Sequence, residues 1–477
     1  MRLGNLLPDA DSTAAEQNVT GFAIDHRKVA PGTIFGAFAG AKFNGEDFID
    51  EAVQNGALAI VARPSAKVTG ALHIAAENPR AEFARLAALF FRPVPEVIVA
   101  VTGTNGKTST VELTRQLWRM AGHVSASIGT LGVTTADEQV ATGLTTPDIV
   151  TFLSNISGLA REGVTHLAYE ASSHGLSQHR SEGMEITVAA FTNLSRDHLD
   201  YHGTMENYFA AKMRLFDELL SDDGTAVIWA DDAWSDKVVE HVKARALRLI
   251  TVGEKGQGIK LKSRQPTQLG QDMLLVIQGE EIKVKLPLIG AYQAYNALVA
   301  AGIVLASGGR VEDVVGHLGR LQPVRGRLER AVICRSGAPV YVDYAHTPDA
   351  LIAAIAAMRP HTMGRLITVF GAGGDRDTGK RPEMGRVAAE ASDIAIVTDD
   401  NPRSEDPAAI RAAILAGAPA DTLIEIADRR EAIAHAISLA KADDIVLIAG
   451  KGHELGQIIG DKILPFDDVQ VARECAA

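Results

Sequence analysis

The sequence predicts an α/β protein of three domains. These are an N-terminal α/β domain over residues 1–92, a central parallel-sheet domain with a phosphate-binding loop over 93–328, and a C-terminal Rossmann-like domain over 329–477. A chain of 477 residues exceeds what one hydrophobic core usually serves, and suggests about three domains. Short apolar runs alternate with helical segments, which is typical of parallel sheets covered by helices. Breaks in this pattern near residues 92–95 and 323–329 mark the two boundaries.

The elements can be predicted in chain order. In the first section, short β-like runs predict strands at residues 33–38 and 57–62. The stretch Arg92-Pro93-Val94-Pro95 predicts a linker, because proline disfavours helix both at itself and just before. The central section predicts strands at 97–101, 166–169 and 188–192, and a helix at 111–121. The last section predicts a doubly wound fold with strands at 340–343, 366–370, 394–398 and 445–449, and helices at 349–358 and 430–440.

The composition of the chain argues against several classes of protein. A hydrophobic fraction of 46% and a charged fraction of 22% are ordinary for a globular enzyme. The net charge of −12 argues against nonspecific nucleic-acid binding, which relies on basic surface. Cys334 and Cys475 are too few for a disulfide framework or a zinc site. Met1-Arg2 leads into polar sequence, and the most apolar helical stretch, 297–306, is about half a membrane span. We expect a cytoplasmic enzyme.

Residues 101–110, VTGTNGKTST, predict a phosphate-binding loop. They lie between an apolar strand and a helix, so loop amides and the helix N-terminus would face an anion, and Lys107 would add a mobile charge. Thr108 or Ser109 could hold a magnesium ion beside the phosphates. The loop is shorter than the full Walker pattern, since Val101 stands where that pattern has its first glycine. The alternative interpretation is a glycine turn before an ordinary helix cap. The predicted loop comprises Gly103, Thr104, Asn105, Gly106, Lys107, Thr108 and Ser109.

Two later strand ends carry carboxylate and imidazole groups. Glu170 ends the predicted strand at 166–169, where it could hold magnesium beside the loop hydroxyl. The polar loop after the strand at 188–192 repeats the arrangement with His198. Loop residues of these types are individually more often caps or surface groups, so the prediction depends on several such loops leaving one sheet. The other candidates in that second loop are Asp197, Asp200 and His202.

Lys212 lies against an apolar helical stripe formed by Phe209, Met213, Phe216 and Leu220. One interpretation is that its long side chain reaches past the stripe to water. The other is that burial favours the neutral amine, which could take up carbon dioxide and become a carbamate that adds a carboxylate-like metal ligand. The sequence leaves both interpretations open.

Ten ordered motifs along the chain are similar to those of the ATP-dependent Mur ligase family, which builds the peptide stem of bacterial cell-wall precursors. The motifs include GTNGKT at 103–108, LTTPD at 144–148, YEASSHGLSQHR at 169–180, TNLSRDHLDYHG at 192–203, YFAAKM at 208–213, DDNPR at 399–403 and GKGHE at 450–454. The resemblance covers essentially the whole chain. It implies a UDP-precursor-binding N-terminal domain, an ATP-binding central domain and an amino-acid-binding C-terminal domain.

Within the family, the chain most resembles the ligases that add meso-2,6-diaminopimelate to the D-glutamate of UDP-N-acetylmuramoyl-L-alanyl-D-glutamate. The resemblance implies that ATP phosphorylates this carboxylate and that the amine attacks the acyl-phosphate, giving ADP and phosphate. It also implies Mg²⁺, a carbamate on Lys212, and a monomer that acts in the cytoplasm without nucleic acid or membrane insertion. Such an enzyme serves peptidoglycan synthesis, and through it cell shape and division.

The resemblance assigns site residues position by position. Lys107 would contact the ATP phosphates, while Thr108, Glu170, His198 and carbamylated Lys212 would hold magnesium. His26 stands in the uridine site where serine is usual. The remaining positions fall into three groups: Thr145, Thr146, Ser172, Gln178 and Arg180 for the UDP-muramoyl dipeptide; Asn296, Arg327 and Asp343 for ATP; and Arg376, Asp400, Asn401, Pro402, Arg403, Gly450 and Glu454 for the amino acid.

Alternative functions remain open from the sequence. The lysine-adding counterpart, a peptide-recycling ligase and a folylpolyglutamate synthetase would share the architecture. Arg403 favours diaminopimelate over lysine, because a guanidinium can clamp the distal carboxylate that lysine lacks. Asn401-Pro402 could also be no more than a turn at a strand end. From a different class, a nucleotide-gated sensor of UDP-sugar precursors would bind the same ligands without turnover.

Overall fold

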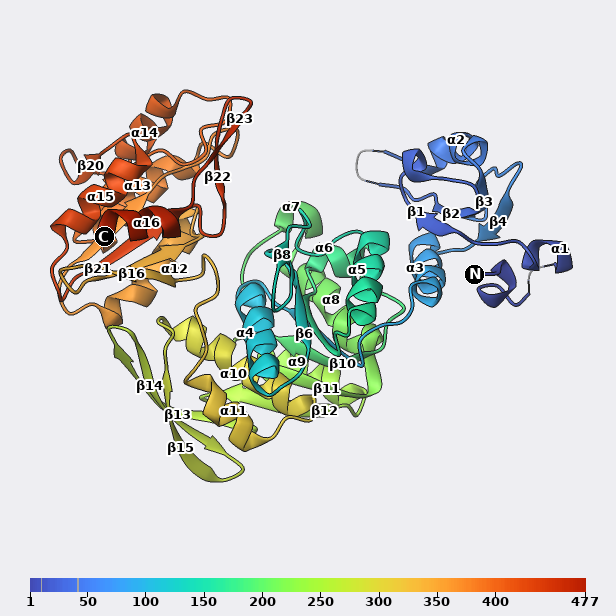
Figure 1. The fold of residues 1–477 in the computed structure, drawn as a ribbon, viewed down its shortest axis with the longest axis horizontal. Coiled ribbons are helices and arrows are strands. Elements are labelled where there is room, and N and C mark those ends of the chain that lie inside the picture. Colours follow the sequence, from blue (N-terminus) through green and yellow to red (C-terminus); the bar gives the residue numbers. More distant parts are fainter. Residues whose placement is uncertain (10, 41–42) are drawn as a thin grey trace. The chain divides into compact units, whose positions relative to one another are not determined.

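In the computed structural model, which describes residues 1–9, 11–40 and 43–477, helices and strands alternate along the chain (Figure 1). The chain divides into two units. The first contains residues 1–251 and 302–309, and the second contains residues 252–301 and 310–477. Two elements, β12 (Arg248–Gly253) and α10 (Ala291–Ala306), include residues of both units.

The first unit begins with a four-stranded sheet in which every neighbouring pair is parallel. The strand predicted at 57–62 has those bounds, whereas the one predicted at 33–38 ends at Gly36. Phe35, Ile49 and Ile60 are buried in one core cluster that joins the sheet to α2. The elements are α1 (Ser12–Ala15), β1 (Gly21–Ala23), β2 (Thr33–Gly36), α2 (Ile49–Gln54), β3 (Ala57–Ala62), β4 (Leu72–Ala75) and α3 (Pro79–Phe90).

The larger sheet of the first unit follows residues 92–95, the predicted linker. From β12 onward its strand order is β12-β11-β10-β5-β9-β6-β7-β8, and the pairs from β11 to β6 are parallel, while β7 and β8 add antiparallel strands at one edge. Parallel pairing places the carboxyl ends of β5, β9 and β10 at one edge of the sheet. The strands are β5 (Val97–Thr102), β6 (Ser125–Gly129), β7 (Gly132–Thr134), β8 (Gln139–Val140), β9 (His166–Glu170), β10 (Ile186–Phe191) and β11 (Leu220–Trp229).

The helices of this part connect the strands. Helix α4 begins at Lys107, four residues before the predicted start at 111, because its polar first turns are buried and internally bonded. Thr114 Oγ1, for example, donates to the Thr110 carbonyl at 2.7 Å, which keeps a hydroxyl compatible with the buried helix. The helices are α4 (Lys107–Met120), α5 (Ile149–Arg161), α6 (Ser173–Ser177), α7 (Leu199–His202), α8 (Met205–Arg214) and α9 (Ser235–Ala244), and a π-helical turn follows α8 at Leu215–Leu219.

The second unit contains an antiparallel meander that the sequence analysis did not predict. It consists of β13 (Ile259–Thr267), β14 (Gly270–Ile277) and β15 (Glu280–Leu286), and α11 (Val311–Leu318) follows in the chain after α10. Along β13, buried Ile259 and Leu261 alternate with exposed Lys260 and Lys262. This period of two is the signature of a sheet with one face in solvent.

A six-stranded sheet of order β16-β17-β21-β18-β19-β20 forms the core of the second unit, and all its pairs are parallel except β16 with β17. Alternate residues face opposite sides: Leu447 packs with α12, α13 and α14, whereas Val446 and Ile448 pack with α15 and α16. The predicted doubly wound arrangement is therefore confirmed. The strands are β16 (Glu329–Ile333), β17 (Pro339–Asp343), β18 (Leu366–Phe370), β19 (Ile394–Val397), β20 (Leu423–Glu425) and β21 (Ile445–Ala449).

Helices cover both faces of that sheet, and a two-stranded hairpin follows β21 in the chain. The helices are α12 (Pro348–Met358), α13 (Lys380–Ala391), α14 (Pro407–Leu415), α15 (Arg429–Leu439) and α16 (Asp468–Ala476), and the hairpin pairs β22 (Gly456–Ile459) with β23 (Lys462–Pro465). Among the described residues, no helix combines the length and apolarity that crossing a membrane requires.

Candidate active site

The loop between β5 and α4 has the geometry of a phosphate site. Gly106 adopts a left-handed conformation with φ of +85° and stands at the N-cap of α4. No side chain of the described residues caps this helix start, so the first-turn amides can face an anion. The predicted strand–loop–helix arrangement is present at residues 97–120.

The loop after β10 supports the phosphate loop from the side. Thr192 Oγ1 donates to the Asn105 carbonyl at 2.6 Å, and Asn193 both donates to that carbonyl and accepts from the Asn105 amide. A side-chain carbon at Gly103, where φ is +144°, would collide with the Thr192 hydroxyl. Glycine is therefore required at position 103 for both conformation and space.

Two lysines meet at one carbonyl oxygen within this loop. Lys107 Nζ donates to the Gly103 carbonyl at 2.9 Å and to the Thr104 carbonyl at 2.8 Å. Lys212 Nζ donates to the same Gly103 oxygen at 2.7 Å, and the Tyr208 ring lies 4.5 Å from the ammonium. The residue is only 1% exposed, so Lys212 does not reach water along the apolar stripe.

Burial changes the acid–base behaviour of Lys212. Desolvation lowers its pKa well below the ordinary value, the positive charge of Lys107 lowers it further, and Asp197 opposes the shift. Removal from water disfavours the charged form of an amine. The neutral form, which is the nucleophilic form, is therefore more populated here than in an exposed lysine.

Glu170, at the carboxyl end of β9, is a buried carboxylate with 2% exposure. Its Oε1 accepts from the Thr130 amide at 2.7 Å, and Thr130 Oγ1 is 3.1 Å from Thr145 Oγ1. Thr146 Oγ1 donates to the Glu170 carbonyl at 2.8 Å. The candidate metal ligand and two candidate substrate residues therefore share one hydrogen-bonded network.

The same network extends to the other predicted dipeptide residues. Thr146 Oγ1 is 2.9 Å from Ser172 Oγ, and the Thr146 carbonyl accepts from Arg180 Nη1 at 2.8 Å. Arg180 Nη2 donates to Gln178 Oε1 at 2.6 Å, and Gln178 Nε2 donates to the Tyr201 hydroxyl at 3.1 Å. The structure thus brings together all five residues predicted for the dipeptide.

His198 lies apart from these polar contacts. It stands at the N-cap of α7 with φ of +51°, and its side chain is 46% exposed. Its ring contacts those of His174 and Tyr208, at centroid distances of 4.9 and 6.1 Å. Within the described part of the chain, no group of three His, Cys, Asp or Glu side chains forms a ready metal site.

His26 is placed in the four-stranded sheet region and contacts none of the other candidates among the described residues. Its ring stacks on Phe48 at 4.4 Å, and Nε2 is 3.1 Å from Glu51 Oε2. Asp25, beside it, forms an ion pair with Arg27 that lowers the pKa of Asp25 to about 2.

The candidates on the ATP side of the second unit also form a cluster. Asn296 Nδ2 donates to Gln293 Oε1 at 3.2 Å, and Gln293 Nε2 donates to the Arg327 carbonyl at 2.9 Å. Asp343 accepts from the Leu328 and Ala345 amides, and burial raises its pKa although Arg327 opposes the shift. The Arg327 guanidinium lies 5.1 Å from the Tyr344 ring centroid. Its buried Nε has no hydrogen-bond partner among the described residues.

The amino-acid candidates converge between β19 and the segment after β21. Asn401 Nδ2 donates to Glu454 Oε2 at 2.8 Å. Arg403, with φ of +52°, donates from Nη1 to the Gly374 carbonyl at 2.6 Å. A side chain at Gly450 would collide with Asp400 Oδ2. Arg376 is exposed on the loop after β18, and the Pro402 carbonyl accepts from the Glu405 amide.

Several residues outside the predicted set also contact the candidate site residues. Lys451 is buried and donates to both Asn401 and Glu454. Thr130 and Tyr201 bond to the predicted ligands Glu170 and Gln178. The sequence holds a signal for Lys451, which lies within the quoted GKGHE motif, and for Tyr201, which lies within the quoted motif at 192–203, but none for Thr130.

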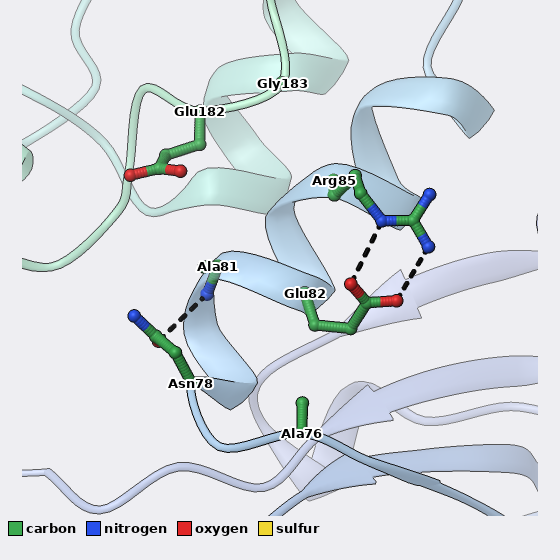
Figure 2. Close-up of a pocket in the computed structure, with 7 residues that line it drawn as sticks. All are labelled: Ala76, Asn78, Ala81, Glu82, Arg85, Glu182 and Gly183. Carbon is green, nitrogen blue, oxygen red and sulfur yellow. Dashed lines mark hydrogen bonds and ion pairs between the residues drawn. The ribbon is translucent and has the colours of Figure 1, made fainter. Parts of the chain in front are cut away.

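A separate cavity of about 380 Å³ lies between α3 and the loop at residues 182–183 (Figure 2). Figure 2 shows the Arg85–Glu82 ion pair on one wall and Asn78, which caps α3, on another. None of the residues lining this cavity is a predicted site residue. The cavity therefore does not mark the candidate active site.

Three family models match the chain. They are described as Mur ligase family, catalytic domain, over residues 18–102; Mur ligase middle domain, over 101–304; and Mur ligase, glutamate ligase domain, over 326–452. This is the three-domain architecture of the predicted fold class.

Curated relatives and solved structures agree with these matches. A UDP-N-acetylmuramoyl-L-alanyl-D-glutamate--2,6-diaminopimelate ligase from Zymomonas mobilis is 61% identical over 96% of this chain and 94% of its own. One of the same name from Bradyrhizobium diazoefficiens is 50% identical over 96% and 95%. A solved structure of that name matches with a TM-score of 0.78 and 34% identity, over 100% of this chain and 98% of its own. A MurF ligase from Thermotoga maritima in complex with ADP, at 21% identity and a TM-score of 0.61 over 96% and 97%, shares the fold. These matches show that the chain belongs to the Mur ligase family.

Proposed function

We propose that the protein adds meso-2,6-diaminopimelate to the D-glutamate carboxylate of UDP-N-acetylmuramoyl-L-alanyl-D-glutamate in peptidoglycan precursor synthesis. The observation that carries this proposal is the 61% identity, over 96% of the chain, to a relative named for that reaction. ATP gives its γ-phosphoryl group to the carboxylate, forming ADP and an acyl-phosphate. The amine of diaminopimelate then attacks the acyl carbon, losing a proton as phosphate leaves, and an amide results.

The phosphate loop would bind the ATP phosphates. The uncapped start of α4 supplies amide donors, and Lys107 can exchange its contacts with the Gly103 and Thr104 carbonyls for phosphate oxygens. Phosphoryl transfer depends mainly on positioning and charge cancellation, which this arrangement supports. The cluster of Asn296, Arg327 and Asp343 would bind the rest of ATP.

Thr108, Glu170 and His198 would hold Mg²⁺. A buried carboxylate and a hydroxyl beside the phosphate loop are hard oxygen donors of the kind that Mg²⁺ prefers. When bound, Mg²⁺ would reduce the repulsion between the triphosphate and the substrate carboxylate. Mg²⁺ takes near-octahedral coordination by oxygen, so a further anionic oxygen ligand would complement these residues.

Lys212 would supply that ligand as a carbamate. Its neutral amine is favoured by burial, so the nitrogen lone pair can bond to the carbon of carbon dioxide, with loss of one proton. The product carries a negative charge next to Lys107, which the Gly103 contact already places nearby. A carboxylate-like group at this buried position would complete the magnesium site.

The carbamate can be tested without measuring turnover. Protein equilibrated with ¹³C-labelled bicarbonate should give a carbamate carbon resonance that is missing in Lys212→Ala and present in the exposed-lysine variant Lys67→Ala. Lys212→Ala should also lose activity, and a short carboxylic acid should restore part of it. A labelled wild-type enzyme without the resonance would refute the carbamate.

The amino-acid cluster favours diaminopimelate over lysine. Arg403 and Asn401 would bind the distal carboxylate, and Glu454 the distal ammonium. Lysine has no distal carboxylate, so it would leave both donors unpaired. Sites that bind a polar group tightly reject analogues lacking it by about 10⁴ or more, so discrimination of at least about a thousandfold is expected.

An amino-acid panel tests the proposed reaction. Purified enzyme, ATP and UDP-muramoyl dipeptide should yield amide product and phosphate with meso-diaminopimelate, and at least about a thousandfold less with lysine. Equal use of lysine would indicate the lysine-adding alternative. Nucleotide and precursor binding without any phosphate release would indicate the sensor.

We also propose that the enzyme acts in the cytoplasm as a monomer, with no nucleic-acid partner and no membrane insertion. The net charge of −12 supports the absence of a nucleic-acid partner. Sedimentation equilibrium should give the mass of one chain, 50.6 kDa.

A further inference from the structure

Lys451, in the segment after β21, is a fully buried lysine with 0% side-chain exposure. Its ammonium donates to the Gly456 carbonyl at 2.6 Å, to Asn401 Oδ1 at 3.0 Å and to Glu454 Oε2 at 3.3 Å. An ammonium has three hydrogens to donate, and here each has an acceptor. The buried charge is therefore fully satisfied, and two of its three acceptors, Asn401 and Glu454, belong to the candidate amino-acid site.

This contact fixes which end of the Asn401 amide points inward. Lys451 Nζ and the Ile458 backbone amide, 3.0 and 2.9 Å from the same Asn401 atom, can only donate. That atom must be the acceptor Oδ1, and Nδ2 must point the other way. Among the described residues Nδ2 has one acceptor, Glu454 Oε2, so its second hydrogen remains available.

The same contact fixes Glu454. Its Oε2 accepts from both Lys451 and Asn401, whereas Oε1 has no donor within the described residues. The Glu454 side chain is 33% exposed, so Oε1 can meet a ligand. The site thus presents an amide donor at Asn401 next to a carboxylate acceptor at Glu454.

Lys451 also ties the β22 hairpin to the loop that carries Arg403. It donates to the Gly456 carbonyl at the start of β22. Two residues further on, the Ile458 carbonyl accepts from the Arg403 amide at 3.0 Å, and the Gly460 amide donates to the Arg403 carbonyl at 2.7 Å. These bonds hold the Arg403 backbone in its left-handed conformation.

We infer that Lys451 is a positioning residue that sets the donor and acceptor polarity of the amino-acid site, so that Asn401 offers only a donor and Glu454 only an acceptor. A carboxylate beside an ammonium, as at the distal end of a diamino diacid, complements that polarity. The inference deepens the proposed function and rests on it. Lys451 itself contacts no substrate.

The test replaces Lys451 by methionine, which has a similar length but no charge. In Lys451→Met, Asn401 Oδ1 keeps the Ile458 amide as its only donor among the described residues, and Glu454 loses its buried cation. The KM for diaminopimelate should therefore rise at least about tenfold, the equivalent of one lost charge-assisted hydrogen bond. The KM values for ATP and for the UDP-precursor should stay within about twofold, which a general loss of structure would not produce. Lys462→Met, an exposed lysine on β23, is the matched control and should leave all three constants unchanged.

Two further variants keep the test decisive if Lys451→Met does not fold. Lys451→Arg retains the charge, but its planar guanidinium cannot take the place of the compact ammonium that donates to three acceptors. This variant should therefore also raise the KM for diaminopimelate selectively. Asn401→Asp leaves Lys451 intact, keeps the acceptor that faces it and removes the donor, so diaminopimelate affinity should fall. An unchanged KM for diaminopimelate in a folded Lys451 variant, or in Asn401→Asp, would overturn the inference.

The two proposals fail separately. A wild-type enzyme that adds lysine as readily as diaminopimelate overturns the proposed specificity. A Lys451→Met enzyme with the wild-type KM for diaminopimelate overturns only the role of Lys451.

Discussion

At the scale of single residues, the Gly103 carbonyl is the point where two lysines of different behaviour meet. Lys107 belongs to the loop itself and donates to two loop carbonyls. Lys212 comes from α8 and is buried, and its lowered pKa favours the neutral amine. Lys107 is therefore suited to neutralise the charge of a phosphate, and Lys212 is suited to react as a neutral amine.

Lys107→Ala should abolish turnover and leave the fold intact. The substitution removes the cation that would neutralise the ATP phosphates, and the hydrogen bonds that it breaks to the Gly103 and Thr104 carbonyls lie within one loop. We expect a loss of at least about a thousandfold in kcat/KM, in line with other groups that stabilise charge in a transition state. Phosphate release measures the loss of turnover, and thermal melting measures whether the fold is retained. Lys67→Ala, which replaces an exposed lysine, is the control. Activity within a few-fold of wild type would remove the phosphate-loop interpretation.

His166 should make the first unit sensitive to acid. Burial, together with a smaller effect of His123, whose ring lies 4.0 Å away, lowers its pKa from 6.5 to about 4. Between these values the unfolded chain binds a proton that the folded chain does not, so stability falls as the pH drops from about 6.5 to about 4. The urea midpoint, followed by tryptophan fluorescence, should decrease over this range, and less so in His166→Phe. Equal pH dependence in both proteins would contradict the assignment.

At the scale of elements, one ion pair joins two helices of the second unit. Arg429, the first residue of α15, bonds through Nε and Nη2 to both carboxylate oxygens of Asp468, the first residue of α16. Both side chains have 0% exposure, and Nη2 also donates to the Ala449 carbonyl at the end of β21. The pair therefore fixes the starts of two helices against the central strand.

Arg429→Met should destabilise the second unit by about 3–5 kcal/mol, because it leaves a buried carboxylate unpaired. The double variant Arg429→Met/Asp468→Leu should recover most of this loss, since it removes both charges together. Urea denaturation followed by far-UV circular dichroism measures both changes. A double variant no more stable than the single one would show that the pair matters for more than its charge.

The elements also show how far sequence reasoning reaches. The strands predicted at 366–370 and 445–449 have those bounds in the structure, because fully buried parallel strands are continuous apolar runs between polar loops. The meander β13–β15 was missed although its alternating pattern was present. The burial of Lys451 could not be predicted, because Asn401, its partner, lies 50 residues away and a lysine beside glycine is ordinarily exposed. Sequence could predict the site's residue types, but not their mutual orientation.

At the scale of the whole molecule, the two units differ in their tryptophan content and in the candidate sites that they contain. All three tryptophans, Trp118, Trp229 and Trp234, lie in the first unit, together with the phosphate loop and the dipeptide cluster. The amino-acid candidates all lie in the second unit. Fluorescence therefore reports the first unit, and circular dichroism reports both.

Ligands should therefore stabilise the units separately. Diaminopimelate at about 100 times its Kd should stabilise the second unit by about 2.7 kcal/mol, seen by circular dichroism, and leave the tryptophan transition in place. The UDP-precursor should shift the tryptophan transition instead. If diaminopimelate raised the tryptophan transition as well, the residues assigned to its site would be incomplete.

The bond between Lys451 and Asn401 has a consequence for the order of events during translation. Its partners are separated by 50 residues, and Lys451 is made after every strand of the six-stranded sheet. At about 5–20 residues per second, roughly 3–10 s pass between synthesis of the two residues. A nascent chain can therefore already hold its phosphate loop while its amino-acid site still lacks the lysine that sets its polarity. The phosphate loop is thus synthesised first, and Lys451, which sets the polarity of the amino-acid site, is synthesised near the end of the chain.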